Sequence, residues 1–534
     1  MRLTDFYNTY FRIIKSITIK SMKKRLLLTA LVLVSSFSAF SQQKDVSIRI
    51  YPERGKQTIS KHIYGHFAEH LGTCIYGGLW VGEDSKIPNT KGYRTDVLNA
   101  LKKLQIPNLR WPGGCFADEY HWMDGIGPKE NRPKMVNNNW GGVVEDNSFG
   151  THEFLNLCEL LECEPYISGN VGSGTVEELA KWVEYMTSDG DSPMANLRRK
   201  NGRDKAWKVK YLGVGNESWG CGGDMLPDYY ADLYRRYAVY CRNFDENKLF
   251  KIASGASDYD YNWTDVLMKK AGKKMHGLSL HYYTVTGWSG SKGSATEFTP
   301  DDYYWTMGKC LEIEEVIQKH MTIMDKYDKD KKVGLMVDEW GTWWDVEPGT
   351  NPGFLFQQNT MRDAFVAALS LNVFNKYGDR IQMANIAQVV NVLQSMILTK
   401  DDKMTLTPTY HVFDMYRVHQ DATYLPMDII SETKEIRGRN VALVNASASQ
   451  KDGLTHITLA NIDLNAEQNV NIDFSNAKIN SVKGRILTSK NIEDHNTFEN
   501  PDLVKPQTFT GAKIENGKLN IKLPAKSIVV LEIK

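Results

Sequence analysis

The sequence predicts a (β/α)8 barrel followed by an antiparallel β-sandwich. Two observations carry this prediction. Short apolar segments alternate with amphipathic helical stretches over most of the chain, and short alternating strands broken by Asn, Asp, Gly and Lys fill the remainder. Alternation of strand and helix is typical of a parallel sheet, and eight such units close into a barrel. A length of 534 residues accommodates such a barrel together with a second, smaller domain.

Eight apolar segments are the candidate barrel strands, and helical stretches separate them. The strands are expected at 63–67, 108–111, 164–167, 209–214, 251–254, 277–281, 334–338 and 380–384. Apolar residues recur at helical spacing between them, at 95–104, 176–186, 227–243, 304–327 and 359–377. In a barrel of this kind, functional side chains gather at the carboxyl ends of the strands.

The remainder of the chain predicts the β-sandwich. Its strands are expected at 441–446, 454–461, 470–474, 481–487, 518–523 and 527–533. The early segment 46–51 also alternates as a strand, and we assign it to the sandwich because it precedes the first barrel strand. The expected organisation is a signal peptide over 1–41, a strand segment over 42–61 that joins the sandwich, the barrel over 62–398 and the β-sandwich over 399–534.

The first 41 residues have the pattern of a secretory signal peptide. Met22-Lys-Lys-Arg25 is basic, residues 26–34 are apolar except for Thr29, and Ala39-Phe-Ser41 supplies a small-residue cleavage site. Met22 is the preferred start. The apolar run is too short for a stable membrane anchor, and no Cys follows the cleavage site to carry a lipid. The pattern therefore predicts an exported protein, periplasmic or secreted, with no membrane attachment after cleavage.

Composition and charge narrow the partners. The net charge is +1 and no basic block stands out, which argues against nucleic acid or an anionic membrane. The seven Cys match no zinc spacing, so we expect buried free thiols with one disulfide at most. His66, His70 and His281 are potential metal ligands, but no helix carries the i, i+4 pair His66 and His70. Neither a metal nor another cofactor is expected.

Two glutamates at strand ends carry the strongest functional signal. Glu217 follows the fourth strand and Glu339 ends the seventh, and burying a carboxylate at such a position is costly unless it has a function. A single glutamate there is most often a salt bridge or a helix cap. Strands four and seven face each other across the barrel mouth, so Glu217 and Glu339 can converge on one bond. Carboxylates about 5–5.5 Å apart are typical of retaining glycoside hydrolysis through a covalent intermediate.

These motifs resemble those of the α-L-arabinofuranosidases of glycoside hydrolase family 51, a (β/α)8 family of clan A. The similarity extends from about residue 48 to residue 534. The shared motifs are Gly-x-Phe-x-Glu-His-x-Gly at 65–72, Arg-aromatic-Pro-Gly-Gly at 110–114, Gly-x-Gly-Asn-Glu at 213–217, Asp-Glu-Trp at 338–340 and Ala-Gln-x-x-Asn-Val at 387–392. The resemblance implies that Glu217 is the acid/base and Glu339 the nucleophile.

The resemblance also implies the sugar-binding residues. Glu69, Asn216 and Gln388 match positions that bind the arabinofuranosyl hydroxyls, and Tyr283 matches the tyrosine that hydrogen-bonds the nucleophile. One position departs from the family pattern, because many members have Asn after Pro-Gly-Gly where this chain has Cys115. A thiol is a weak donor and acceptor, so Cys115 is expected to line the pocket without acting as a nucleophile.

For four further residues near these motifs, the sequence predicts a role less specifically. Arg110 is expected to pair with a neighbouring carboxylate and not to touch substrate. The tryptophans Trp340, Trp343 and Trp344 fit equally well as a wall of the pocket or as ordinary core.

The activity implied by the resemblance is exo-acting release of terminal non-reducing α-L-arabinofuranosyl residues from arabinan, arabinoxylan or their oligosaccharides, by double displacement. A homo-oligomer is also implied. The main alternative is another retaining clan A hydrolase with the same two glutamates, such as an endoglucanase or xylanase. A non-catalytic glycan-binding protein is the less favoured alternative. The motif at 65–72 and Gln388 favour a furanose pocket over an open cleft.

Overall fold

A computed structural model describes residues 45–475 and 479–534 of the chain. The predicted signal peptide over 1–41 lies outside the described residues. Among the described residues, no helix is both long and apolar enough to cross a membrane.

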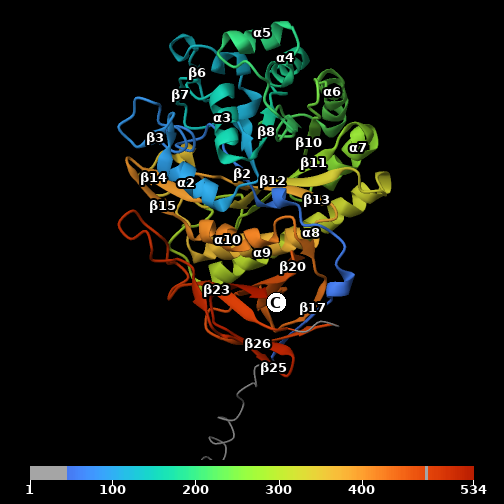
Figure 1. The fold of residues 1–534 in the computed structure, drawn as a ribbon, viewed down its shortest axis with the longest axis vertical. Helices are drawn as coiled ribbons and strands as arrows, with labels where there is room; N and C mark the ends of the chain where they lie inside the picture. Colours follow the sequence, from blue (N-terminus) through green and yellow to red (C-terminus); the bar gives the residue numbers. More distant parts are fainter. Residues whose placement is uncertain (1–44, 476–478) are drawn as a thin grey trace, which may run out of the picture. The chain divides into compact units, whose positions relative to one another are not determined.

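Eight parallel strands form a closed barrel, which confirms the predicted fold class (Figure 1). In order around the barrel they are β2 (Gly65–Phe67), β5 (Asn108–Trp111), β8 (Glu164–Gly169), β9 (Tyr211–Val214), β10 (Phe250–Ser257), β11 (Gly277–Thr284), β12 (Gly334–Thr342) and β13 (Ile381–Ala387). Each overlaps one predicted strand. The predicted first strand, 63–67, begins two residues too early. Residues Lys61–Tyr64 form a 3-10 helix before β2, and the Ser60 side chain accepts a hydrogen bond from the backbone N–H of His62 at its start.

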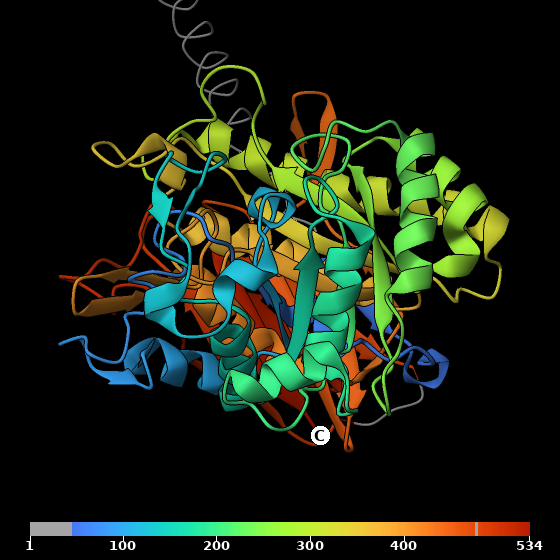
Figure 2. The same cartoon turned by 90° about the horizontal axis from the view of Figure 1, so that it is seen from above.

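Helices flank the barrel strands, as Figure 2 shows for the green and yellow parts of the chain. They are α2 (Thr95–Leu104), α3 (Thr151–Leu161), α4 (Val176–Thr187), α5 (Pro193–Lys200), α6 (Pro227–Tyr240), α7 (Tyr261–Ala271), α8 (Pro300–Tyr327), α9 (Met361–Lys376) and α10 (Pro408–Tyr416). The predicted helical ranges correspond to α2, α4, α6, α8 and α9, whereas α3, α5, α7 and α10 were not among them. Of these four, α10 lies in the region assigned to the sandwich. Its Phe413 packs against Trp340 of β12 with ring centroids 6.2 Å apart, so this helix belongs to the barrel's hydrophobic core.

Two sheets form the β-sandwich. The five-stranded sheet has the order β17 (Met427–Ile430), β1 (Val46–Ile50), β22 (Gln468–Phe474), β26 (Lys518–Leu523) and β25 (Ala512–Glu515). The six-stranded sheet has the order β16 (Thr423–Tyr424), β20 (Val444–Lys451), β21 (Leu454–Asn461), β27 (Ser527–Ile533), β23 (Val482–Thr488) and β24 (Gln507–Phe509). Within the described parts of these sheets, β1 and β22 make the one parallel pairing. The whole barrel provides the crossover connection that such a pairing needs.

The remaining strands form four small two-stranded sheets. These are β3 (Asn89–Thr90) with β4 (Tyr93–Arg94), β6 (Met135–Val136) with β7 (Val144–Glu145), β14 (Ile397–Lys400) with β15 (Lys403–Leu406), and β18 (Thr433–Ile436) with β19 (Arg439–Ala442).

The six-stranded sheet is covered on both faces. Successive side chains of a strand point to opposite faces, so β27 divides its apolar residues between two cores. Val529 and Leu531 pack into the core of the sandwich, whereas Ile528 and Val530 pack into the core shared with the barrel. Helix α9, buried along nearly its full length, lies between β12 of the barrel and strands β20 and β21 of this sheet.

Candidate active site

The fourth barrel strand, β9, ends in a tight turn that presents Glu217. Gly215 has a φ of +85° and Glu217 a φ of +40°, so both lie in the left-handed region that L side chains rarely adopt. The carbonyl of Glu217 accepts hydrogen bonds from the backbone N–H groups of Gly220 at 2.7 Å and Gly222 at 3.1 Å. These bonds hold the turn in a strained conformation, which is a common property of functional sites.

Glu339 lies on β12, where it pairs in register with His281 of the neighbouring strand β11. Its carboxylate is buried and accepts two charge-assisted hydrogen bonds. Arg110 Nη1 donates to Oε1 at 2.8 Å, and the hydroxyl of Tyr283 donates to Oε2 at 2.8 Å. Both contacts stabilise a negative charge on this carboxylate. The pairing of Arg110 with a carboxylate is as predicted, and the Tyr283 contact is the one that the family resemblance implied.

The two glutamates converge, although they come from strands β9 and β12. A carboxylate oxygen of Glu217, a carboxylate oxygen of Glu339 and a ring nitrogen of His281 all lie within 4.8 Å of one another. This spacing suits two carboxyl groups that act on opposite sides of one glycosidic bond in a retaining enzyme.

His281 lies between three carboxylates. Its Nδ1 is 2.8 Å from Glu217 Oε1 and 3.6 Å from Glu339 Oε2, and its Nε2 is 3.3 Å from Asp338 Oδ1. Burial alone would lower its pKa, but the charge of Glu339 and the contacts with Asp338 and Glu217 raise the pKa to about 10. His281 is therefore a cation that links the carboxylates. Sequence reasoning considered it only as a metal ligand, although its place at the end of a barrel strand already indicated the site.

The other two histidines considered as metal ligands, His66 and His70, do not join His281 at the carboxylates. His66 packs against Phe413 with ring centroids 5.0 Å apart, and His70 stacks on Phe116 at 4.6 Å. Each is therefore occupied in aromatic packing at the end of β2.

Glu69 and Gln388 meet in the pocket, although 319 residues separate them in the chain. Gln388 Nε2 donates to Glu69 Oε2 at 3.0 Å. The other oxygen of Glu69 accepts from Trp140 Nε1 at 2.9 Å and from the backbone N–H of Phe116 at 3.1 Å. Burial and the charge of Glu339 raise the pKa of Glu69 to about 7. Gln388 Oε1 is buried without a hydrogen-bond partner among the described residues, so it remains available to accept from a ligand.

Asn216 is oriented from two sides. Arg110 Nη2 donates to its side-chain Oδ1 at 2.6 Å. Its Nδ2 lies 3.9 Å from Cys221 Sγ, and because Nδ2 carries two hydrogens, one is left to donate to a ligand. Its backbone N–H donates to Asp118 Oδ2 at 3.1 Å. Asp118 was missed by the sequence analysis. It also accepts from the backbone N–H groups of Val171 and Gly172, and burial raises its pKa to about 7. The signal that could have found it is its position four residues after the motif at 110–114.

The three tryptophans of the seventh strand end divide between core and pocket. Trp340 and Trp344 are buried in the core. Trp343 is half-buried and packs edge-on against Tyr283, with ring centroids 5.1 Å apart. Trp288, which the sequence analysis did not single out, packs on Trp343 at 5.6 Å and is 51% exposed. Trp343 and Trp288 therefore form an aromatic edge beside the residue that contacts Glu339.

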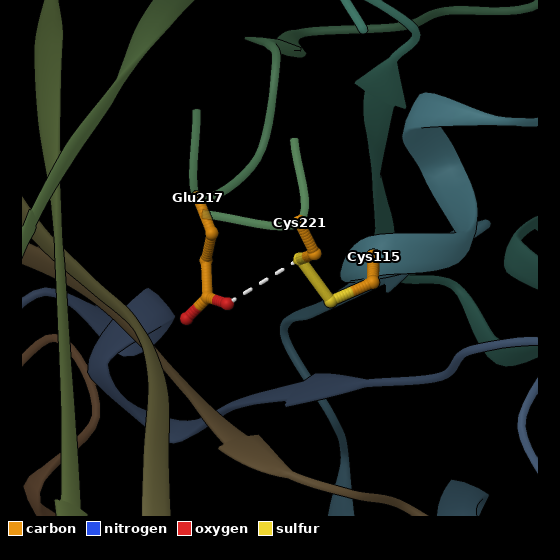
Figure 3. A group of neighbouring side chains, drawn as sticks. All are labelled: Cys115, Glu217 and Cys221. Carbon is orange, nitrogen blue, oxygen red and sulfur yellow. Dashed lines mark hydrogen bonds between the residues drawn. A yellow bond between two sulfur atoms is a disulfide. The ribbon is translucent and has the colours of Figure 1, made fainter. Parts of the chain in front are cut away.

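Cys115 is not a free thiol. It forms a disulfide with Cys221, with the two Cα atoms 5.5 Å apart, and Figure 3 shows this bond directly beside Glu217. The prediction that Cys115 is a free thiol in the pocket was therefore wrong, and its sulfur carries no proton. The other five cysteines are free and buried, as expected for most of the seven: Cys74, Cys158, Cys163, Cys241 and Cys310.

Comparisons with known proteins agree with this geometry. The family model described as the alpha-L-arabinofuranosidase 1 domain matches residues 100–292, and that of the alpha-L-arabinofuranosidase C-terminal domain matches residues 338–527. The chain is 70% identical to the intracellular exo-alpha-L-arabinofuranosidase of Bacteroides ovatus, over 96% of this chain and 100% of that protein.

Two solved structures are also similar. The GH51 arabinofuranosidase from Xanthomonas axonopodis pv. citri superposes with a TM-score of 0.91 at 51% identity, over 92% of this chain and 100% of that one. The alpha-L-arabinofuranosidase from Thermotoga maritima, solved as an arabinose complex, has a TM-score of 0.78 at 31% identity, over 91% and 99%.

The comparison with the Bacteroides ovatus protein overturns one prediction. That relative matches this chain along its full length and is named intracellular, which contradicts the exported location predicted from residues 1–41. A basic segment followed by an apolar run, which carried the prediction, is a short compositional pattern and is a weak signal by itself.

Proposed function

This chain belongs to the α-L-arabinofuranosidases of glycoside hydrolase family 51, and we propose that Glu217 is its acid/base and Glu339 its nucleophile. The enzyme is a retaining, exo-acting hydrolase that releases terminal α-L-arabinofuranosyl residues from arabinose-containing glycans. The substrates we propose in particular are arabinan, arabinoxylan and their oligosaccharides. A homo-oligomeric assembly remains a proposal by family resemblance.

The observation that carries the role assignment is the different surroundings of two convergent carboxylates. Glu339 receives hydrogen bonds from a guanidinium and a phenol, and both favour the charged oxygen that attacks the anomeric carbon. Glu217 is the more open of the two, with 19% of its side chain exposed against 7% for Glu339. An acid/base needs such access, because it donates a proton to the leaving oxygen and then activates the incoming water.

The reaction proceeds in two displacements at this pair. In the first, Glu217 protonates the departing glycosidic oxygen while Glu339 attacks the anomeric carbon, which gives a covalent arabinosyl-enzyme. In the second, Glu217 removes a proton from water, and the water displaces Glu339 with net retention of configuration.

The remaining pocket residues fit recognition of a furanose. Asn216, held by Arg110, is positioned to donate to the sugar 2-hydroxyl, a contact that strengthens as positive charge develops on the ring. Glu69 and Gln388 offer a carboxylate and an unpartnered carbonyl oxygen to the other hydroxyls. Cys115 lines the same pocket as half of a disulfide.

The alternative is a depolymerising clan A hydrolase, such as an endoglucanase or xylanase, and the full-length relatives weigh against it. The test compares arabinose release from p-nitrophenyl α-L-arabinofuranoside and from arabino-oligosaccharides with depolymerisation of β-glucan and xylan. We expect arabinose release alone, with the α-anomer formed first by NMR. Shortening of the polysaccharide backbones without arabinose release would contradict the proposal, as would a β-anomer formed first.

A further inference from the structure

The disulfide between Cys115 and Cys221 connects two loops that build the active site. Cys115 opens the segment after β5, and the next residue, Phe116, donates its backbone N–H to the buried carboxylate of Glu69. Cys221 lies in the turn after β9 that carries Glu217. Since the bonded residues are 106 positions apart, the disulfide is the covalent link between the sugar-binding side of the pocket and the acid/base side.

The sulfur of Cys221 contacts the side chains of Glu217 and Asn216. It lies 3.6 Å from Glu217 Oε2 (Figure 3). It also lies 3.9 Å from Asn216 Nδ2. A disulfide sulfur can accept a weak hydrogen bond but cannot donate one. It can therefore accept from the Asn216 amide and from a protonated Glu217, the form that must give its proton to the leaving group. A free thiol at the same place would donate to Glu217, and a thiolate would repel its ionised form.

The turn that carries Glu217 needs an external restraint. Glu217 itself is in the left-handed region, and the turn folds back so closely that a side chain on Gly222 would lie 1.7 Å from the carbonyl oxygen of Asn216. Such a conformation persists only when its surroundings hold it. Cys221 directly precedes Gly222, so the disulfide fixes the turn at its tightest point.

Among the cysteines, the two that form this disulfide are the ones that a thiol reagent in solution can reach. Cys221 is exposed and Cys115 half-buried, whereas the five free cysteines are buried. Burial raises the pKa of Cys74, Cys241 and Cys310 to about 12, which suppresses the thiolate that exchange requires.

We propose that the Cys115–Cys221 disulfide is a positioning element for Glu217, and that its reversible opening by a small dithiol weakens the proton-donor half of the reaction. The inference rests on the proposed function. In the opening step, a thiolate of the dithiol attacks one sulfur and the S–S bond breaks. The second thiol of the reductant then resolves the mixed disulfide. The enzyme gains two electrons and two protons as a dithiol, and the reductant becomes a cyclic disulfide.

The test uses the full-length wild-type enzyme in two redox states. One sample is equilibrated with oxidised glutathione and the other with dithiothreitol, and free thiols are counted in denaturant. We expect five thiols in the oxidised sample and seven in the reduced one. Seven thiols in the oxidised sample would overturn the proposal.

Rates are then compared on two substrates that differ in leaving group. General acid catalysis contributes about 10²–10⁴ to rate, so its partial loss should lower kcat on arabino-oligosaccharide at least about tenfold in the reduced enzyme. The aryl arabinofuranoside needs little protonation and should lose much less. The pH–rate profile on the oligosaccharide should also shift, and reoxidation should restore both.

Variants separate positioning from a structural role. Cys221→Ser should reproduce the reduced enzyme and no longer respond to dithiothreitol, while Cys163→Ser, a buried free cysteine before β8, should respond like wild type. Equal rates in both redox states overturn the inference. Equal loss on both substrates with an unchanged pH profile also overturns it, since that pattern indicates only loss of structure. Absence of turnover in the oxidised enzyme on either substrate contradicts the proposed function, and the inference with it.

Discussion

At the scale of single residues, two chemically identical side chains acquire different roles from their neighbours. His281 contacts both glutamates, but Glu339 also accepts hydrogen bonds from a guanidinium and a phenol, whereas Glu217 lies beside a disulfide sulfur. The sequence predicted both glutamates, because each was expected at the carboxyl end of a barrel strand. The family resemblance implied the Tyr283 contact, and Arg110 was expected to pair with a carboxylate. That this carboxylate is Glu339 could not be predicted, since Arg110 lies more than two hundred positions from Glu339 and meets it only through closure of the barrel.

Replacing Glu217 separates the two halves of the reaction. Glu217→Ala should reduce kcat on arabino-oligosaccharides by about 10²–10⁴, because the leaving group no longer receives a proton. On p-nitrophenyl α-L-arabinofuranoside the loss should be smaller, and added azide should restore turnover and yield an arabinosyl azide of retained configuration. Glu339→Ala serves as the comparison, with turnover lost on both substrates and no rescue to a retained product. Equal losses on both substrates in Glu217→Ala, without rescue, would refute the acid/base assignment.

A neighbouring pair of tyrosines tests the role of Tyr283. The Tyr283 hydroxyl donates to Glu339, whereas that of Tyr282 donates to the backbone carbonyl of Lys309. Hydrogen bonds to charged groups are worth about 1.5–3 kcal/mol, so Tyr283→Phe should lower kcat/KM by about 10- to 100-fold. Tyr282→Phe removes a buried hydroxyl from the same strand and should leave kcat/KM within about twofold of wild type. Similar losses in both variants would indicate a general packing effect.

At the scale of elements, His281 is a charged link between strand ends. It lies on β11 and contacts Glu217 after β9 and both Asp338 and Glu339 on β12. Its pKa is raised to about 10 in the folded protein, against 6.5 as its ordinary value. The folded state thus holds a proton that the unfolded chain releases first. The stabilisation is complete below pH 6.5 and is lost as the pH rises from 6.5 towards 10.

The measurement is urea unfolding at several pH values within that window. Wild type should lose stability with rising pH relative to His281→Gln, so the difference in unfolding free energy between them should narrow between pH 6.5 and 10. A constant difference for His281→Gln would show that His281 does not hold an extra proton in the folded state.

Strands and helices were predicted correctly where the apolar residues follow a single strand-like or helix-like spacing. The strands of the barrel are short, apolar and followed by polar site residues, so each of the eight was found within a few residues. Helix α10 was missed because it sits among segments of strand-like alternation, and its apolar residues pack against the barrel. The Cys115–Cys221 bond was beyond prediction because two loops far apart in sequence had first to be placed side by side.

At the scale of the whole described molecule, the six-stranded sheet has a core on each side. Ile528 of β27 is fully buried on the face towards the barrel, so Ile528→Ala leaves a cavity in the shared core. We expect a loss of about 2–5 kcal/mol in unfolding free energy, measured by urea denaturation. Ile430→Ala, on the exposed strand β17, should cost less than about 0.5 kcal/mol. Equal effects would mean that the shared core does not contribute to stability.

Strand β1 has a consequence for biosynthesis. Val46 pairs with Val470 of β22 and Ser47 with Ile430 of β17, so the first described strand leaves the ribosome long before its partners exist. At about 5–20 residues per second, the interval is roughly 20 to 80 seconds. Through that time β1 presents an unpaired, apolar edge of the kind that promotes aggregation. The barrel strands all precede residue 388 and can pair meanwhile, whereas the five-stranded sheet can be completed only after the residues of β22 have been synthesised.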